Sequence, residues 1–173
     1  MRFAPARVRG RLHGAVLGTA HTIAGTVYGT IVVMGSITAG ADGTRDPVRL
    51  AVIVAATVLV LWLAHVYAHG LGESISRRRR LDRAEFLSVA RREFSIPLAA
   101  AAPTVALILG GLDAVGNATA VWLALGIGLT TLAVQGARYA TLEHLGPLAT
   151  AASIAMNLGL GLVIVALKVF VAH

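Results

Sequence analysis

The stretch Leu50-Ala-Val-Ile-Val-Ala-Ala-Thr-Val-Leu-Val-Leu-Trp62 decides the fold, because it is apolar on every side and carries no charge. A membrane-spanning strand would instead alternate apolar and polar residues. Lipid offers no hydrogen-bond partner to a free backbone N–H or C=O group, so an apolar run of about 20 residues crosses a bilayer as a helix. The segment that contains this stretch, residues 49–72, is therefore predicted to be a transmembrane helix.

Four further windows of the chain also lack Asp, Glu, Lys and Arg. The chain of 173 residues is 57% hydrophobic and holds 19 further residues of glycine, whereas soluble domains are about 45–50% apolar with glycine included. We therefore predict an all-α, polytopic integral membrane protein that forms one membrane domain over residues 1–173. The five predicted spans are residues 12–40, 49–72, 95–112, 117–137 and 146–169.

A basic amphipathic segment, residues 74–94, separates the second and third predicted spans. Phe86, Val89, Ala90 and Phe94 recur at helical spacing and give it an apolar stripe beside a basic face. A helix of this kind usually lies along the membrane interface among anionic headgroups. We therefore expect lipid contacts rather than nucleic-acid binding, despite the net charge of +7. The arginines predicted to contact anionic lipid are Arg77, Arg78, Arg79, Arg80 and Arg83.

The basic residues divide unequally between the two sides of a membrane crossed five times. Arg45, Arg49 and Lys168 fall on one side, and all other Lys and Arg fall on the opposite side. Cytoplasmic loops carry the excess of Lys and Arg. We therefore predict a protein of the cytoplasmic (plasma) membrane with its N-terminus inside and its C-terminus outside. The first span is expected to be retained, because the apolar core of a signal peptide has only about 7–15 residues.

Small residues repeat along the first predicted span. Gly14 and Gly18, and then Gly25 and Gly29, are spaced four apart, and the pairs recur every eleven residues, which keeps them on one helix face. Such a face lets another helix approach closely. The spacing leaves open whether that helix belongs to the same chain or to a second copy.

Ionisable residues inside the predicted spans are the candidate functional residues, because such groups are rare at depth without a role. Trp62, His65, His69 and Glu73 lie on one stripe of the second span, and two imidazoles one turn apart can bind one metal ion. His21 lies on the glycine face at a depth comparable with that of His65, so the two are expected to meet. A hydrogen bond to a neighbouring carbonyl is the alternative role for each histidine.

Asn157 lies near the middle of the last predicted span, on a small and polar stripe with Ser153 and Gly161. Interhelical hydrogen bonding is the expected role of this stripe, and a substrate contact by Asn157 is the alternative. The predicted pathway for a metal ion or for protons consists of His21, His65, His69, Glu73 and Asn157.

Two stretches, Arg11-Leu-His-Gly-Ala-Val-Leu-Gly-Thr-Ala-His21-Thr-Ile23 and His69-Gly-Leu-Gly-Glu73-Ser-Ile-Ser76, are similar to the start of the first helix and the end of the second helix in the vacuolar iron transporter family. The resemblance implies a homodimer of five-helix subunits that moves Fe²⁺ or Mn²⁺ out of the cytoplasm in exchange for protons. It places Glu73 at the family's glutamate, His69 at its methionine and His21 at its aspartate.

The departures from that family change the expected chemistry. His21 lacks the oxygen ligand and the negative charge of an aspartate, and arginines replace the family's glutamate-rich loop. Imidazoles with one carboxylate suit Zn²⁺, Ni²⁺, Cu²⁺ or Fe²⁺ better than Mg²⁺ or Ca²⁺. Because histidine titrates near neutral pH, the same residues can also carry protons. We therefore predict a homodimeric transporter or channel for divalent metal ions or for protons.

Two other classes of function remain open. One is a membrane haem protein in which His21 and either His65 or His69 are axial ligands. The other is a non-catalytic scaffold whose glycine faces and basic segment bind another membrane protein or anionic lipid. An enzyme is not expected, because the chain has no cysteine and no nucleophile, base and orienting group at usable spacing. For the transporter, no resident cofactor is predicted, and the candidate bound ion is the transported divalent metal ion itself.

Overall fold

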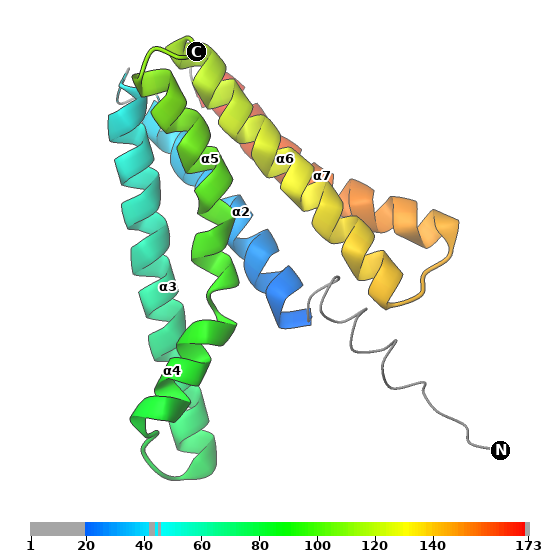
Figure 1. The fold of residues 1–173 in the computed structure, drawn as a ribbon. Coiled ribbons are helices and arrows are strands. Elements are labelled where there is room, and N and C mark those ends of the chain that lie inside the picture. Colours follow the sequence, from blue (N-terminus) through cyan, green and yellow to red (C-terminus); the bar gives the residue numbers. More distant parts are fainter. Residues whose placement is uncertain (1–19, 42–43, 45, 172–173) are drawn as a thin grey trace, which may run out of the picture.

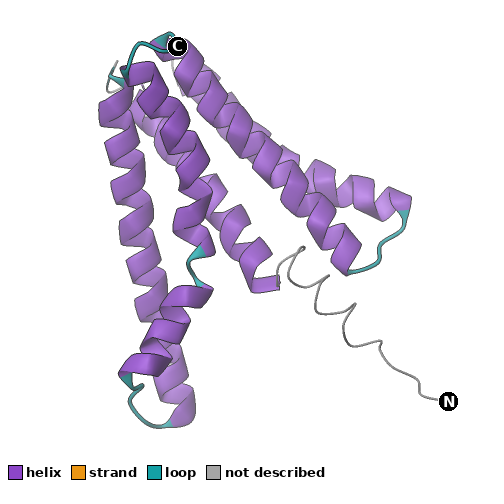
Figure 2. Cartoon of the chain, in the orientation of Figure 1, coloured by secondary structure: helices purple, strands orange, loops and turns teal. Residues whose placement is uncertain are grey.

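The computed structural model describes residues 20–41, 44 and 46–171, which form six α-helices and no strand (Figure 2). Four of these helices are long and apolar enough to cross a membrane, and α4 with α5 gives a fifth span if that bent pair is counted as one. The all-α prediction is confirmed, and the helices are consistent with a membrane protein. Their bounds are α2 Ala20–Ala41, α3 Pro47–Arg77, α4 Arg83–Arg92, α5 Ser95–Gly111, α6 Asn117–Leu142 and α7 Pro147–Val171.

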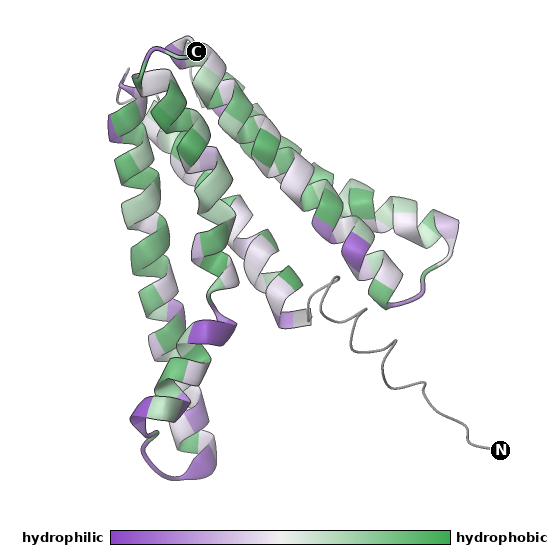
Figure 3. Cartoon of the chain, in the orientation of Figure 1, coloured by the Kyte–Doolittle hydropathy of each residue, from purple (hydrophilic) through white to green (hydrophobic). Residues whose placement is uncertain are grey.

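The helices form two groups. α2, α3 and α5 lie side by side, and α6 and α7 form a hairpin that meets them at one end and diverges from them toward the other (Figure 1). Hydrophobic residues cover the long helices, whereas hydrophilic residues gather around α4 and at the far end of the hairpin (Figure 3). The core lies among α2, α3, α5 and α6. Its largest fully buried side chains are Met34, Ile37, Leu50, Ile96, Leu107, Leu125 and Leu132.

The helix α3 extends beyond the predicted span 49–72 at both ends. Asp46 caps its start, where Asp46 Oδ1 accepts a hydrogen bond from the N–H of Val48 at 2.9 Å, and Pro47 fills the first position, which needs no N–H donor. At the other end α3 continues until Arg78, whose left-handed backbone (φ 54°) closes the helix. The length of an apolar window reflects the thickness of the bilayer. It does not mark the ends of the helix, because polar residues can continue the helix beyond the membrane.

The sequence predicted a single helix over the basic segment 74–94, and this prediction is wrong. In the structure, a new helix start interrupts the segment. Asp82 and Glu85 form a capping box: the Glu85 N–H donates to Asp82 Oδ1 at 2.8 Å, and the Asp82 N–H donates to Glu85 Oε2 at 3.0 Å. α4 begins there and meets α5 at a bend of 46°. The apolar stripe of α4 packs on α3, with Val89 fully buried and Phe86 beside Gly70.

The remaining spans differ from the prediction mainly at one end of α6. α5 and α7 follow the predicted windows 95–112 and 146–169 closely. α6 continues past residue 137 to Leu142, and the left-handed residue His144 (φ 51°) ends it before the turn into α7. The predicted start of the first span at residue 12 lies outside the described residues.

Glycines set the closest helix contacts. Gly25 lies against Ser95, and Gly29 lies against the backbone of Ile96, so the helix that approaches this face is α5 of the same chain. Gly14 and Gly18 lie outside the described residues. In the hairpin, Gly136 of α6 lies against the backbone of α7 at Ser153. The spacing left open whether the approaching helix belongs to the same chain or to a second copy. For Gly25 and Gly29, it belongs to the same chain.

Candidate functional site

Polar side chains gather where α3 passes the junction of α4 and α5, and we call this region the corner. The stripe predicted on α3 faces it. Trp62 Nε1 donates to the carbonyl oxygen of Ala90 at 3.3 Å, and its ring meets Phe94 edge-on, with centroids 6.2 Å apart. These two contacts hold the end of α4 against α3. They thereby position the residues that follow α4 in the chain.

Glu93 ends α4 and points at α3. Its Oε1 lies 3.0 Å from Nδ1 of His69, and its side chain is only 12% exposed, against 54% for His69. A carboxylate that has lost most of its contact with water needs a hydrogen-bonding partner. His69 provides that partner, and about half of its own side chain remains exposed on the protein surface.

His65 extends the polar contacts from the corner toward α2. Its ring lies 5.5 Å from that of His69 and 4.8 Å from that of Tyr28 on α2, measured between centroids. Within the described part of the chain, His65 has no hydrogen bond or ion pair. Glu93, His69, His65 and Tyr28 thus form a continuous series of titratable side chains, which we call the titratable row.

Glu73 lies beside the titratable row and serves a different contact. Its Oε1 is 2.5 Å from Nη2 of Arg77, and its Oε2 is 3.0 Å from Nη2 of Arg92. The first pair lies within α3, and the second joins α3 to the end of α4. Both carboxylate oxygens are therefore engaged by guanidinium groups.

Two other predicted pathway residues do not join the corner. His21 is exposed in the first turn of α2 and makes no hydrogen bond, ion pair or ring contact with any other described residue. Tyr28, two turns further along α2, contacts His65 instead. Asn157 Nδ2 donates to the carbonyl oxygen of Ser153 at 3.0 Å within α7, while Ser153 Oγ donates to the carbonyl oxygen of Gly136 on α6. The expected interhelical hydrogen bond is therefore made by Ser153.

The arginines of the basic segment fall into two sets. Arg77 Nη1 and Arg79 Nη2 both donate to Glu85 Oε1, at 2.7 and 2.5 Å. The Arg79 guanidinium, and then the Asp82 N–H, lower the pKa of Glu85 to about 2, and the same carboxylate raises the pKa of Arg79. Lipid contact by these arginines stays a prediction. Of the five arginines predicted to contact lipid, those with no ion pair among the described residues are Arg78, Arg80 and Arg83.

The corner does not assemble a metal site from the described residues. Among residues 20–41, 44 and 46–171, no three His, Asp or Glu side chains converge in a group that could hold a metal ion. The titratable row is extended, so its two imidazoles and its carboxylate follow one another instead of surrounding a point. This geometry suits the passage of a proton better than the coordination of a cation.

Sequence reasoning missed Tyr28 and Glu93. Tyr28 lies seven residues after His21, on the same helix face, so the periodicity that singled out His21 also pointed to it. Glu93 is the last acidic residue before the third predicted span. Its pairing with His69 depends on the bend between α4 and α5, which no sequence pattern marked.

Comparisons with models of protein families, with curated proteins and with solved structures find no match to this chain. The resemblance to the vacuolar iron transporter family therefore stays a prediction, and a function has to be argued from the corner itself.

Proposed function

We propose that this protein moves protons across a membrane, with the titratable row as part of the path. The observation that supports this best is the pairing of His69 Nδ1 with Glu93 Oε1 at 3.0 Å, next to the ring of His65. Imidazole can accept a proton on one nitrogen and release one from the other, and it titrates near neutral pH. The exposed His69 is the entry, and His65 and Tyr28 carry the path toward α2.

Protons are a better-supported substrate than divalent metal ions. A metal ion would need a group of ligands at one point, which the described residues do not provide. It would also have to pass the guanidinium groups around Glu73, which repel cations and already occupy that carboxylate. A proton needs only neighbouring donors and acceptors, and the titratable row offers these without a ligand cage.

We propose that the corner faces the cytoplasm and that the membrane is the cytoplasmic (plasma) membrane. The corner carries the arginines of α4 and of the turn before it, whereas the opposite ends of the helices carry Arg49 and Lys168. An excess of Arg and Lys on one side marks the cytoplasmic side. In this orientation protons enter or leave the titratable row from the cytoplasm.

The test is proton flux in proteoliposomes that contain a pH-sensitive dye, driven by a potassium diffusion potential. We expect flux with the wild-type protein and loss of most of it in His65→Gln, His69→Gln and Tyr28→Phe. Tyr28→Phe is the sharpest variant, because it keeps the ring that packs on His65 and removes only the titratable hydroxyl. His144→Asn is the matched control, since His144 is exposed outside the corner and Asn tolerates its left-handed backbone.

Other outcomes point to the other classes. Equal flux in wild type and Tyr28→Phe would contradict a path through the titratable row. Uptake of Fe²⁺, Mn²⁺, Zn²⁺ or Ni²⁺ without proton movement would favour a metal transporter. A Soret band in the purified protein would favour a haem protein. Absence of every flux, with folded protein, would favour the scaffold.

A further inference from the structure

The helix α4 carries a second amphipathic face, opposite the one that packs on α3. The apolar stripe that the sequence pointed at the membrane packs on α3 instead, where Val89 is fully buried. Arg83, Leu87 and Arg91 follow one another at intervals of four residues and therefore share the other side of the helix. Leu87 and, at the end of α4, Phe94 are each 54% exposed. We call these four residues, Arg83, Leu87, Arg91 and Phe94, the outer face.

The two arginines give the outer face a positive charge that the described part of the chain does not neutralise. Arg83 and Arg91 are both exposed, and neither side chain makes a hydrogen bond or an ion pair with another described residue. Arg92, the neighbour of Arg91, differs, because it turns toward α3 and pairs with Glu73. The guanidinium groups of the outer face therefore remain available to an anion from outside the protein.

The acidic residues near α4 are engaged elsewhere. Their partners are Arg77 and Arg92 for Glu73, Arg77 and Arg79 for Glu85, His69 for Glu93, and the N–H of Glu85 for Asp82. Asp42 is the single acidic residue of the chain outside the described residues. It follows Ala41 directly, before the start of α3, whereas the corner lies at the other end of that helix. The charge of the outer face is therefore set by its arginines.

The helix α5 places the outer face at the boundary of the membrane. α5 has 17 residues, which at about 1.5 Å per residue span about 26 Å, less than the thickness of about 30 Å of a hydrocarbon core. The end of α4 therefore completes the span. Because α4 meets α5 at a bend of 46°, the rest of α4 rises only obliquely from the membrane. Phe94 thus lies at the hydrocarbon boundary, and Leu87 lies close to the headgroups.

We propose that the outer face binds anionic phospholipid, whose phosphate groups contact the two guanidinium groups while the upper acyl carbons pack on Leu87 and Phe94. Arginine recognises phosphate through paired hydrogen bonds, and exposed apolar side chains between arginines are typical of helices that lie in a membrane interface. Arg83 and Arg91 are about 12 Å apart along the helix, so they reach neighbouring headgroups. The site goes beyond the proposed proton path and rests only on insertion of the helices in a bilayer.

The first test asks whether the outer face touches lipid. Because the chain has no cysteine, Leu87→Cys and its neighbour Ser88→Cys each accept a single NBD fluorophore. Ser88 is the matched control, since it is exposed on a different side of the same helix. In vesicles of phosphatidylcholine with phosphatidylglycerol, we expect aqueous iodide to quench the label at position 87 several-fold less than the label at position 88. Equal quenching at the two positions would overturn the proposal.

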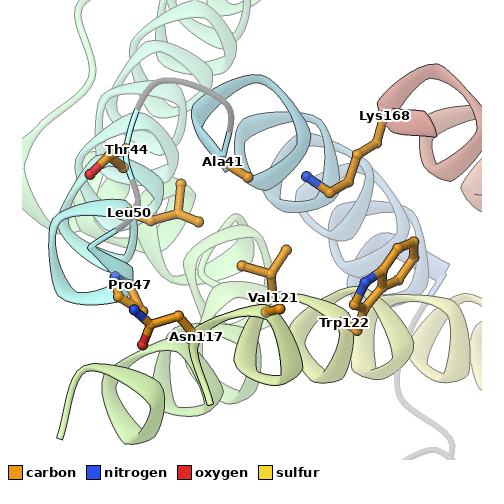
Figure 4. A pocket seen from close by; sticks show the side chains of 9 residues that line it. Ala41, Thr44, Pro47, Leu50, Asn117, Val121, Trp122 and Lys168 are labelled. Carbon is orange, nitrogen blue, oxygen red and sulfur yellow. The ribbon is translucent and has the colours of Figure 1, made fainter. Parts of the chain in front are cut away.

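The second test asks which lipid lies there, with Trp62 as the reporter. The Trp62 ring meets Phe94 edge-on, with centroids 6.2 Å apart. Trp122→Phe removes the other tryptophan, which lies beside a cavity at the opposite end of the helices (Figure 4). Fluorescence is compared in phosphatidylcholine vesicles that contain either dibrominated phosphatidylcholine or dibrominated phosphatidylglycerol, because bromine quenches only a nearby tryptophan. We expect a several-fold preference for phosphatidylglycerol, and equal quenching by the two lipids would overturn the proposal.

Two double variants remove the same charge from the corner. Arg83→Gln with Arg91→Gln should abolish the preference for phosphatidylglycerol. Arg78→Gln with Arg80→Gln should retain it, because these arginines lie in the turn between α3 and α4 at the tip of the corner (Figure 1). An equal loss in both would show a general attraction and overturn the site.

Soluble glycerol 3-phosphate distinguishes a lipid headgroup from a free phosphate. It should leave the preference of the protein with wild-type arginines unchanged, and loss of the preference would overturn the lipid as the ligand. The NBD comparison decides whether the outer face contacts the membrane even if a double variant fails to fold.

Discussion

At the corner, α3 is joined to α4 by contacts between partly exposed side chains, whereas α6 and α7 are joined by close approach of their backbones. Arg92 reaches Glu73 across 3.0 Å at the corner, and His69 reaches Glu93. In the hairpin, Gly136 brings the α6 backbone against that of α7 at Ser153. The first kind of contact responds to charge and pH, and the second responds to volume. The two regions are therefore expected to fail under different substitutions.

The largest effect is expected from Gly136→Leu in the hairpin. A Cβ atom at this position would lie 2.9 Å from Cα of Ile154 and 3.0 Å from the carbonyl oxygen of Ser153, and backbone atoms cannot rotate away. Overpacking of this kind costs about 3 kcal/mol of stability when the helices have to separate. Thermal unfolding of the purified protein in detergent measures the loss.

Gly126→Leu is the control for that substitution. Gly126 lies on the same helix and faces open space, so we expect no loss and, because leucine is a better helix former than glycine, a gain of up to about 1 kcal/mol. An equal loss of stability in both variants would show that leucine on α6 is harmful for a reason unrelated to the approach of α7.

The next effect is expected at the corner from Trp62→Phe. The variant keeps a ring against Phe94 and loses the hydrogen bond to the carbonyl oxygen of Ala90, which leaves α4 less firmly held by about 1 kcal/mol. Hydrogen exchange of the α4 amides should increase. Trp122→Phe, which changes the other tryptophan at the far end of the helices, should leave α4 exchange unchanged; an increase there as well would contradict a local contact.

A smaller effect, of opposite sign, is expected from glycine at the two left-handed helix ends. His144 in the hairpin and Arg78 at the corner have φ values of 51° and 54°. The left-handed region strains a residue with a Cβ, and glycine relieves the strain at some cost in unfolded-state entropy, so each variant should gain about 0.5 kcal/mol. Because the gain is a backbone effect, thermal unfolding should show the same sign in both regions. A loss at Arg78→Gly alone would reveal a side-chain role there.

The smallest effect is expected from acid at the corner. Because Arg79 and the Asp82 N–H lower the pKa of Glu85 from 4.5 to about 2, the folded state favours the ionised carboxylate. This contribution is complete above pH 4.5 and is lost as the pH falls through about 2. Fluorescence of Trp62 in a Trp122→Phe background reports the α3–α4 contact. With Glu85 present, the fluorescence signal of the α3–α4 contact should be lost as the pH falls over this range, whereas the signal of Glu85→Gln should not change over it. Identical acid profiles in the two proteins would contradict the role assigned to the Glu85 carboxylate.

Sequence patterns predicted the helices well because charge-free windows record the bilayer thickness. They did not predict the ends of α3 and α6, where residues 73–77 and 138–142 continue the helices beyond the charge-free windows. The capping box at Asp82 was readable from the sequence as Asp followed three residues later by Glu. It would have divided the basic segment correctly.

One part of the candidate site, the stripe on α3, was also predicted from a sequence pattern, in this case helical periodicity. Periodicity alone placed Trp62, His65, His69 and Glu73 on one stripe of α3, and their contacts confirm that they share a face. Partners from other helices depend on how the helices are aligned along their length. Tyr28 rather than His21 meets His65 because α2 and α3 pass each other at a level that a single sequence does not specify.

The hairpin has one more consequence, for the evolution of the chain. Only 6% of the apolar window of α7 is buried within the protein, although its mean hydropathy is 2.0. Its outward side chains, such as Leu148 and Met156, need only be apolar, and drift among Leu, Ile, Val and Met there should be nearly neutral. Relatives of this chain are therefore expected to diverge most along that face and to retain the small residues that face α6. The core among α2, α3, α5 and α6 is the part by which they should be recognised.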